Sequence, residues 1–283
     1  MTRDWFLNRT KFMSSPWLEP VAPIPPGGAA PESPAPVIPV PMFPLWSGWD
    51  VTQIALMMFL SPFVLFFFVG GVAKRYFYPH ESWGQLAQEP ILALAAEFLA
   101  YVIVFFLMVA LIEGKYHVRF GEAIEWHWPR SPFALMALGV LLLFGLQGIA
   151  HFLPIPKEVP FDQFFKQPLD AWLTSIFAVS FGPLMEELFF RGFLYPVLER
   201  RVGVGIGIFL TALLFGLLHA TQLGFAWGPI LIIFLVGVVL TVVRAVSRSV
   251  ASSFLVHVAY NGTLTVFTLI ATGGFRHLER LSQ

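Results

Sequence analysis

Two glutamates and an arginine lie inside an otherwise apolar run of the sequence, MEELFFRGFLY at residues 185–195. Glu187 and Arg191 are four residues apart with the acid first, the order that favours an ion pair along one helix face. Glu186 is displaced by about 100° around the same helix and is free to point elsewhere. The spacing predicts a structural role for Glu187 and Arg191 and a chemical role for Glu186.

Two more polar patterns follow in later apolar runs. In FGLLH, Phe215 and His219 are one helical turn apart, so the aromatic ring shields one side of the imidazole. In HVAYN, His257 and Asn261 share one helix face, and both side chains can donate hydrogen bonds. A carboxylate and an imidazole are suited to activating water, and a pair of donors is suited to holding a developing oxyanion. With Glu186 as the carboxylate, these patterns predict a hydrolytic site.

Each of these groups also has a structural interpretation when it is taken alone. A buried Glu–Arg pair often holds a helix bundle together, and a single membrane histidine is more often a packing residue. We assign His151 and Glu97 to packing or to snorkelling at the membrane interface. The occurrence of three polar motifs in neighbouring apolar segments favours catalysis for the others.

The elements that must position these side chains are membrane helices. The chain has 283 residues, of which 57% are hydrophobic and 12% are charged, which is far more apolar than an ordinary globular domain. Its 17 basic and 17 acidic residues cancel, so no net field favours nucleic acid as a partner. Cysteine is absent, which excludes disulfides, thiolate metal sites and a cysteine nucleophile. We therefore expect a multi-pass membrane protein whose surroundings are the lipid bilayer.

Seven apolar runs approach or exceed the length of about 20 residues that crosses the hydrocarbon core, and they predict an all-α bundle of about seven or eight spans. The predicted spans are 51–73, 91–113, 133–153, 171–198, 204–220, 229–245 and 250–271. Residues 116–130 and 157–170 mix charged and aromatic side chains, which is typical of interfacial segments or short re-entrant helices. Gly182 and Pro183 are expected to break or kink the fourth span beside the glutamates.

The N-terminal part of the chain differs in composition from the rest. Between Pro16 and Pro44 lie 11 of the 23 prolines, which predicts an extended, disordered arm over residues 1–47. The remaining chain divides into N-terminal transmembrane helices at 48–164, a catalytic helix core at 165–272 and a short polar tail at 273–283.

The distribution of Lys and Arg predicts the orientation in the membrane. Ten lie on the N-terminal side of the predicted spans: Arg3, Arg9, Lys11, Lys115, Arg119, Arg130, Arg200, Arg201, Arg244 and Arg248. Six lie on the opposite side: Lys74, Arg75, Lys157, Lys166, Arg276 and Arg280. Because cytoplasmic loops carry the excess of basic residues, we expect a cytoplasmic N-terminus. We also expect the protein to lie in the cell inner membrane.

In its three motifs the sequence resembles the CPBP intramembrane proteases, also called the ABI family. That family includes the type II CAAX prenyl endopeptidases and bacteriocin-processing or self-immunity proteins. Its pattern is EExxxR, FxxxH and HxxxN or HxxxB on successive helices, and this chain has EELFFR at 186–191, FGLLH at 215–219 and HVAYN at 257–261. The resemblance covers about residues 165–272 and does not extend to the arm or to the first spans.

The resemblance implies an intramembrane peptidase that cleaves a membrane-anchored protein or peptide near the membrane surface. It implies that Glu186 is the general base and that His219 positions and activates the water. The oxyanion hole would be formed by His257 and Asn261. Structural support of the site would come from Glu187, Arg191 and Phe215. The family mechanism uses no cofactor and no metal.

Three alternatives stay open at this stage. A zinc-dependent membrane protease could use Glu186, His219 and His257 as ligands, although the sequence contains no HExxH. A non-catalytic immunity-type protein could use the same bundle to sequester a peptide. A transporter could use Glu and His side chains as a proton relay.

Overall fold

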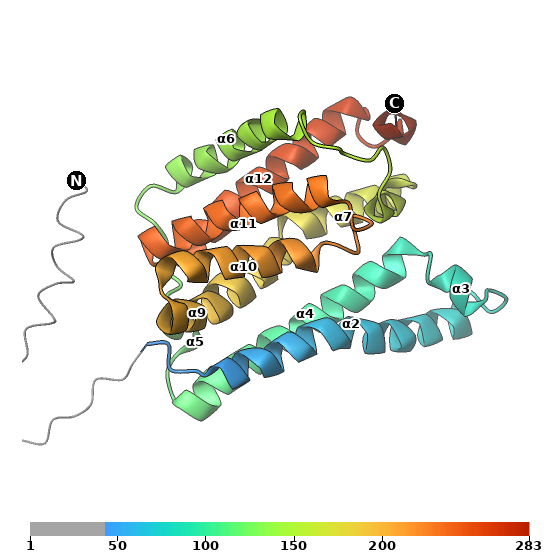
Figure 1. The fold of residues 1–283 in the computed structure, drawn as a ribbon. Coiled ribbons are helices and arrows are strands. Elements are labelled where there is room, and N and C mark those ends of the chain that lie inside the picture. Colours follow the sequence, from blue (N-terminus) through green and yellow to red (C-terminus); the bar gives the residue numbers. More distant parts are fainter. Residues whose placement is uncertain (1–42, 283) are drawn as a thin grey trace, which may run out of the picture. The chain divides into compact units, whose positions relative to one another are not determined.

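The computed structural model describes residues 43–282, and that part of the chain contains helices and no strand (Figure 1). The all-α prediction is thereby confirmed. The predicted arm at 1–47 lies outside the described residues except for its last five.

Six helical segments of the described chain are long and apolar enough to cross a membrane. They are Gly48–Tyr76, Pro90–Lys115, Pro132–Ala150, Pro168–Val202, Trp227–Ser247 and Val250–Ala271, and a shorter apolar helix spans Val204–Leu218. All seven coincide with the predicted spans. Large apolar side chains such as Phe63, Val64 and Phe67 are exposed on the outer face of the first segment, as lipid contact requires. The chain is a multi-pass membrane protein.

Several of these segments are composite. The helices are α2 (Gly48–Tyr76), α3 (Trp83–Leu86), α4 (Pro90–Ala110), the π-helix η1 (Leu111–Lys115), α5 (Phe120–Ala123), α6 (Pro132–Ala150), the 3-10 helix η2 (Pro160–Phe165), α7 (Pro168–Val179), α8 (Phe181–Glu187), the π-helix η3 (Leu188–Leu194), α9 (Tyr195–Val202), α10 (Val204–Leu218), α11 (Trp227–Ser247), α12 (Val250–Ala271) and the 3-10 helix η4 (Leu278–Ser282). The short helices α5 and η2 fall in the two predicted interfacial segments.

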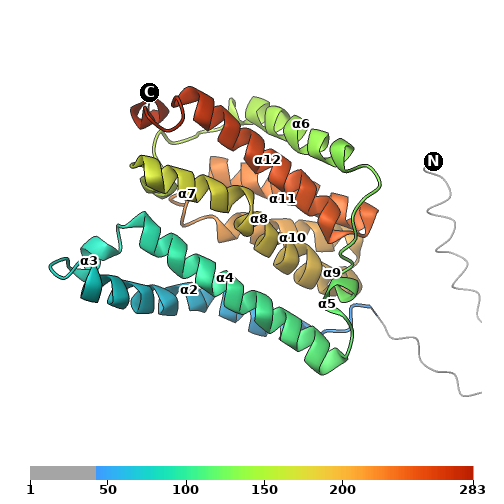
Figure 2. The ribbon, with the colours of Figure 1, turned by 180° about the vertical axis from the view of Figure 1, so that it is seen from behind.

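The helices form three groups, which Figures 1 and 2 show from opposite sides. In one group α2 packs along α4, in another α6 packs along α12, and α10 packs along α11. The composite segment from α7 to α9 links the groups, because α7 and α8 contact both α4 and α12. The fourth span, which carries the glutamates, is therefore enclosed by the bundle.

The fourth span is interrupted, as the sequence predicts. The α-helix ends at Val179, the backbone of Ser180 leaves the helical region with φ −120° and ψ −82°, and a new helix begins at Phe181. Gly182 and Pro183 lie in the first turn of this new helix, where the missing N–H of proline removes no helical hydrogen bond.

Polar side chains join α2 to the end of α4. Asp50 and Ser47 form a reciprocal capping box at the start of α2, with the Ser47 N–H donating to the Asp50 carboxylate at 2.8 Å. The same buried carboxylate accepts hydrogen bonds from Lys115 at 2.6 Å and from Tyr116 at 2.7 Å. These bonds fix the register of the α2–α4 pair.

Residues 43–47, the last of the predicted arm, lie against the bundle. Trp46 is fully buried and stacks on Phe193 of η3 with ring centroids 4.9 Å apart. Its indole N–H donates to the backbone oxygen of Phe193 at 2.9 Å. The chain is thus anchored to the fourth span immediately before α2 begins.

The α6 and α12 helices meet at Gly139. A Cβ atom at this position would lie 2.4 Å from the backbone oxygen of Val256 and 2.8 Å from the Cβ of Ala259. Small residues at such contacts allow membrane helices to approach closely. The position of α12, which carries two of the predicted site residues, depends on this contact.

We expect Gly139→Ala to lower the free energy of unfolding by about 1–3 kcal/mol, because the added methyl group must push α12 away. Denaturant unfolding in detergent micelles measures this change. Gly145→Ala on the same helix is the matched control, since nothing lies within 4 Å of its added Cβ. The control is expected to keep or slightly raise stability. Equal stability of the two variants would contradict the close contact.

Candidate active site

The three motif segments converge on Glu186. Its carboxylate lies 3.8 Å from Nε2 of His219, which caps the end of α10. It lies 3.7 Å from Nε2 of His257 in α12. Both distances exceed that of a direct hydrogen bond and allow a single water molecule to contact the carboxylate and an imidazole together. The short α10 and the interrupted fourth span make this convergence possible.

The neighbouring carboxylate, Glu187, is held in a different way. It is fully buried, and its Oε1 accepts a hydrogen bond from the equally buried Arg191 at 2.9 Å. Arg191 also donates to the backbone oxygen of Gly237 at 3.0 Å and to the Thr241 hydroxyl at 3.3 Å. The ion pair predicted from the i, i+4 spacing is present, and it links α8 and η3 to α11.

Arg191 lies within the π-helix η3, whose wider turn leaves backbone groups for side chains to satisfy. Arg244 of α11 donates to the backbone oxygen of Arg191 at 3.1 Å and pairs with Glu125 at 2.7 Å. Near the C-terminal end of η3, the backbone oxygen of Phe193 accepts a hydrogen bond from the Trp46 indole N–H. Two residues remote in sequence thus support the π-helix that follows the glutamates.

Phe215 and His219 are arranged as predicted. The rings are 4.9 Å apart, and Phe215 is buried. The Nδ1 of His219 lies 2.9 Å from the Phe215 backbone oxygen. Because a carbonyl oxygen only accepts, Nδ1 carries the proton, and Nε2 faces Glu186. Phe215 also lies beneath the Arg191 guanidinium, 4.6 Å from its ring centroid.

His257 and Asn261 lie on one face of α12 and reach different partners. The Nδ1 of His257 is 2.9 Å from Oε1 of Glu187, which assigns the donated proton to this nitrogen. The side-chain amide of Asn261 donates to the Ala178 oxygen at 2.8 Å, immediately before the break in the fourth span. This bond leaves the second amide proton of Asn261 free to bind another acceptor.

All four predicted catalytic side chains line one cavity of about 800 Å³. Gly182 and Pro183 line it next to Glu186, so the interruption of the fourth span faces the site. Aromatic and charged residues of the segment between α6 and α7 also line the cavity, including Phe161, Lys157 and Lys166. A cavity of this size holds a short peptide segment or an apolar ligand.

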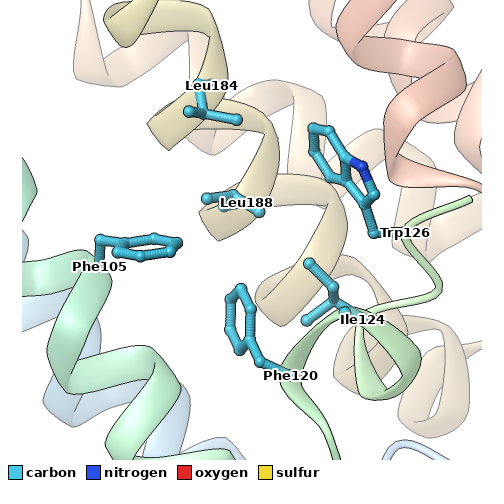
Figure 3. Close-up of a pocket in the computed structure, with 7 residues that line it drawn as sticks. Phe105, Phe120, Ile124, Trp126, Leu184 and Leu188 are labelled. Atoms are coloured by element: carbon cyan, nitrogen blue, oxygen red, sulfur yellow. The ribbon is translucent and has the colours of Figure 1, made fainter.

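A second pocket, of about 290 Å³, lies beside the same fourth span and has no polar lining (Figure 3). Leu184 and Leu188 of α8 and η3 face it together with Phe105 of α4 and with Ile124 and Trp126. Glu186 is absent from its lining. The fourth span therefore presents Glu186 to the larger cavity and Leu184 and Leu188 to the smaller pocket.

The cavity also contains two residues that the motifs do not indicate, Glu97 and Tyr101 of α4. Glu97, which the sequence assigned to packing or to snorkelling at the membrane interface, lines the cavity that contains Glu186. A carboxylate within a predicted span, with a tyrosine four residues later, is a sequence feature that could have indicated these two cavity residues. His151 is exposed at the end of α6.

The zinc alternative requires side chains that are arranged to bind a metal ion. Within residues 43–282, no group of three or more His, Cys, Asp or Glu side chains is arranged to hold a metal ion. Glu186, His219 and His257 lie together but do not form such a group.

We expect Arg191→Lys to lower the free energy of unfolding by about 2 kcal/mol or more. A lysine cannot bond Glu187, Gly237 and Thr241 at once, and each charge-assisted bond lost within the bundle costs about 1.5–3 kcal/mol. Denaturant unfolding in micelles measures the loss. Arg276→Lys, at an exposed position, is the control and is expected to leave stability unchanged. If Arg191→Lys were as stable as the wild type, the hydrogen bonds of the Arg191 guanidinium would not be needed for stability.

Comparison with known proteins gives one family. Residues 168–263 match the family model described as type II CAAX prenyl endopeptidase Rce1-like. Searches of curated proteins and of solved structures gave no match. The matched segment runs from the start of α7 into α12 and includes all three motifs, and the family implies a peptidase. The match supports the resemblance that the motifs indicated: residues 168–263 are similar to the type II CAAX prenyl endopeptidase family.

Proposed function

We propose that this protein is a CPBP-type intramembrane endopeptidase that uses Glu186 to activate water. Its substrate is a membrane-anchored protein or peptide that is cut near the membrane surface. The observation that carries the proposal is the position of Glu186, 3.8 Å from His219 and 3.7 Å from His257 within one cavity.

The reaction begins with a water molecule between Glu186 and His219. The unprotonated Nε2 of His219 accepts one hydrogen bond from the water, and the Glu186 carboxylate removes a proton as the water oxygen attacks the scissile carbonyl carbon. The resulting tetrahedral intermediate collapses when the C–N bond breaks. Glu186 then gives its proton to the departing nitrogen.

His257 and Asn261 stabilise the oxyanion of the intermediate. The free amide proton of Asn261 is one donor. Because Nδ1–H of His257 is committed to Glu187, its Nε2 donates only when both ring nitrogens carry protons, and the adjacent Glu187 carboxylate compensates that charge. Glu187, Arg191 and Phe215 hold these groups in place and take no part in proton transfer.

We expect Glu186→Gln to abolish a small set of cleavages in cells at matched membrane levels. The amide has nearly the same shape but cannot take a proton from water. Mass spectrometry of protein termini compares these cells with wild type. His257→Ala or Asn261→Ala is expected to lower turnover by about 10²–10³, the usual effect of losing one oxyanion donor.

Glu199→Gln, in α9 and absent from the lining of the cavity, is the matched control for removal of a carboxylate. Its profile of termini should equal that of the wild type. Identical profiles for wild type and Glu186→Gln, in cells where the protein acts, would eliminate glutamate-dependent proteolysis. A peptide-sequestering immunity protein would then be the better description.

We propose that the reaction proceeds without a metal ion or other cofactor. The protein purified in detergent is then expected to contain less than stoichiometric zinc by elemental analysis, and cleavage should persist in a chelator. Stoichiometric zinc that is lost in both His219→Ala and His257→Ala, together with chelator-sensitive cleavage, would support the zinc enzyme instead.

We propose that the protein lies in the cell inner membrane. The excess of Lys and Arg on the N-terminal side of the spans supports a cytoplasmic N-terminus. The segments outside the spans that line the cavity, 157–166 and 278–279, then lie on the opposite side of the membrane. The new protein termini found by mass spectrometry show on which side of the membrane the cleaved bonds lie.

A further inference from the structure

Glu97 is an acidic side chain of the cavity that the proposed mechanism does not use. It lies on α4, outside the family-matched segment, yet lines the same cavity as Glu186. The other carboxylates of the lining, Glu158, Asp162 and Glu279, are exposed residues outside the spans. Among the described residues of the spans, Glu97 and Glu186 are therefore the charged side chains that face the cavity.

The position of Glu97 is fixed by its own helix. Tyr101, one turn further along α4, forms a side-chain hydrogen bond with Glu97 and is buried. The Tyr101 ring stacks on Phe177 of α7 with centroids 5.7 Å apart. Phe98 meets Phe181 of α8 edge-on at 4.8 Å. These contacts set the register of α4 against the two helices that precede and carry Glu186.

The two carboxylates of the cavity differ in their partners. Glu186 has His219 and His257 within 4 Å. Within the described part of the chain, no ion pair is recorded for Glu97, and its hydrogen-bond partner is the neutral Tyr101. The charges of Glu97 and Glu186 are close enough to interact electrostatically. An ionisable side chain within a membrane span is costly and is retained where it meets a partner.

Hydrolysis of a peptide bond supplies such a partner. The departing nitrogen receives one proton from Glu186 and a second from the new carboxylic acid, so the products are a carboxylate and an ammonium group. The donors on His257 and Asn261 suit the carboxylate product. An ammonium group in a cavity with apolar walls needs a counter-charge, and Glu186 already has two imidazoles beside it.

We propose that Glu97, held by Tyr101, is the binding subsite for the amino group that peptide cleavage releases. This inference rests on the proposed function and adds the subsite for the leaving half of the substrate. Glu97 accepts charged hydrogen bonds from the new amino terminus and holds that end of the departing peptide in the cavity.

The test uses a C-terminal product peptide from a cleavage that depends on Glu186, synthesised with a free and with an acetylated amino terminus. Inhibition constants for both are measured on the purified full-length protein. In the wild type, the free amine should inhibit roughly tenfold more strongly or better, because acetylation removes a charge-assisted hydrogen bond. In Glu97→Gln the ratio of the two inhibition constants, acetylated over free peptide, should fall to about one.

Two further variants separate recognition from folding. Glu89→Gln removes a carboxylate from the start of the same helix, outside the cavity lining, and should keep the wild-type ratio. Tyr101→Phe keeps the ring on Phe177 but removes the hydroxyl, and should lower the ratio. A ratio of inhibition constants does not depend on the fraction of active protein, so a purely structural role of Glu97 would leave it unchanged.

The outcomes distinguish this inference from the proposed function. A wild type without preference for the amine, or a Glu97→Gln variant with the wild-type ratio, overturns the subsite and leaves the protease intact. The absence of any cleavage dependent on Glu186 overturns both. A lowered ratio in Glu97→Gln, with an unchanged one in Glu89→Gln, supports the subsite.

Discussion

The buried pair of Glu187 and Arg191 is the interaction on which the site depends. Both side chains are fully buried, and removing either partner would leave an uncompensated charge inside a membrane bundle. The surrounding structure therefore has to supply their remaining partners. Gly237 and Thr241 of α11 receive the guanidinium, and His257 of α12 donates to the carboxylate. One ion pair thereby holds three helices in the arrangement that surrounds Glu186.

The two adjacent glutamates show how environment separates identical side chains. Glu187 is paired with Arg191 and accepts a hydrogen bond from Nδ1–H of His257. Glu186, one residue earlier, faces a cavity where both neighbouring imidazoles stand just beyond hydrogen-bonding distance. The π-helix that follows adds an extra residue to one turn, and its free carbonyl groups are bound by Trp46 and Arg244.

Much of this arrangement follows from the sequence, because lipid imposes simple rules. Apolar length locates the seven helical segments, and the i, i+4 spacing identifies the Glu187–Arg191 pair and the ring beneath His219. The π-helix is not predictable from local pattern, since its stability depends on Trp46 and Arg244 at remote positions. The position of Glu97 in the wall of the cavity was not predicted for a related reason. Which face of α4 meets the cavity is decided by the contacts of Phe98 and Tyr101 with the fourth span.

The α2–α4 pair lies outside the segment that matches the protease family, yet α4 contributes Glu97 and Tyr101 to the wall of the cavity. With the roles proposed above, the hydrolytic groups and the amine subsite are encoded in separate stretches of the gene. Substitutions in the first two long helices can therefore change the wall of the cavity while the side chains of Glu186, His219, His257 and Asn261 stay the same. The same division makes chimeras that join the α2–α4 pair of one relative to the remaining helices of another a practical route to altered specificity.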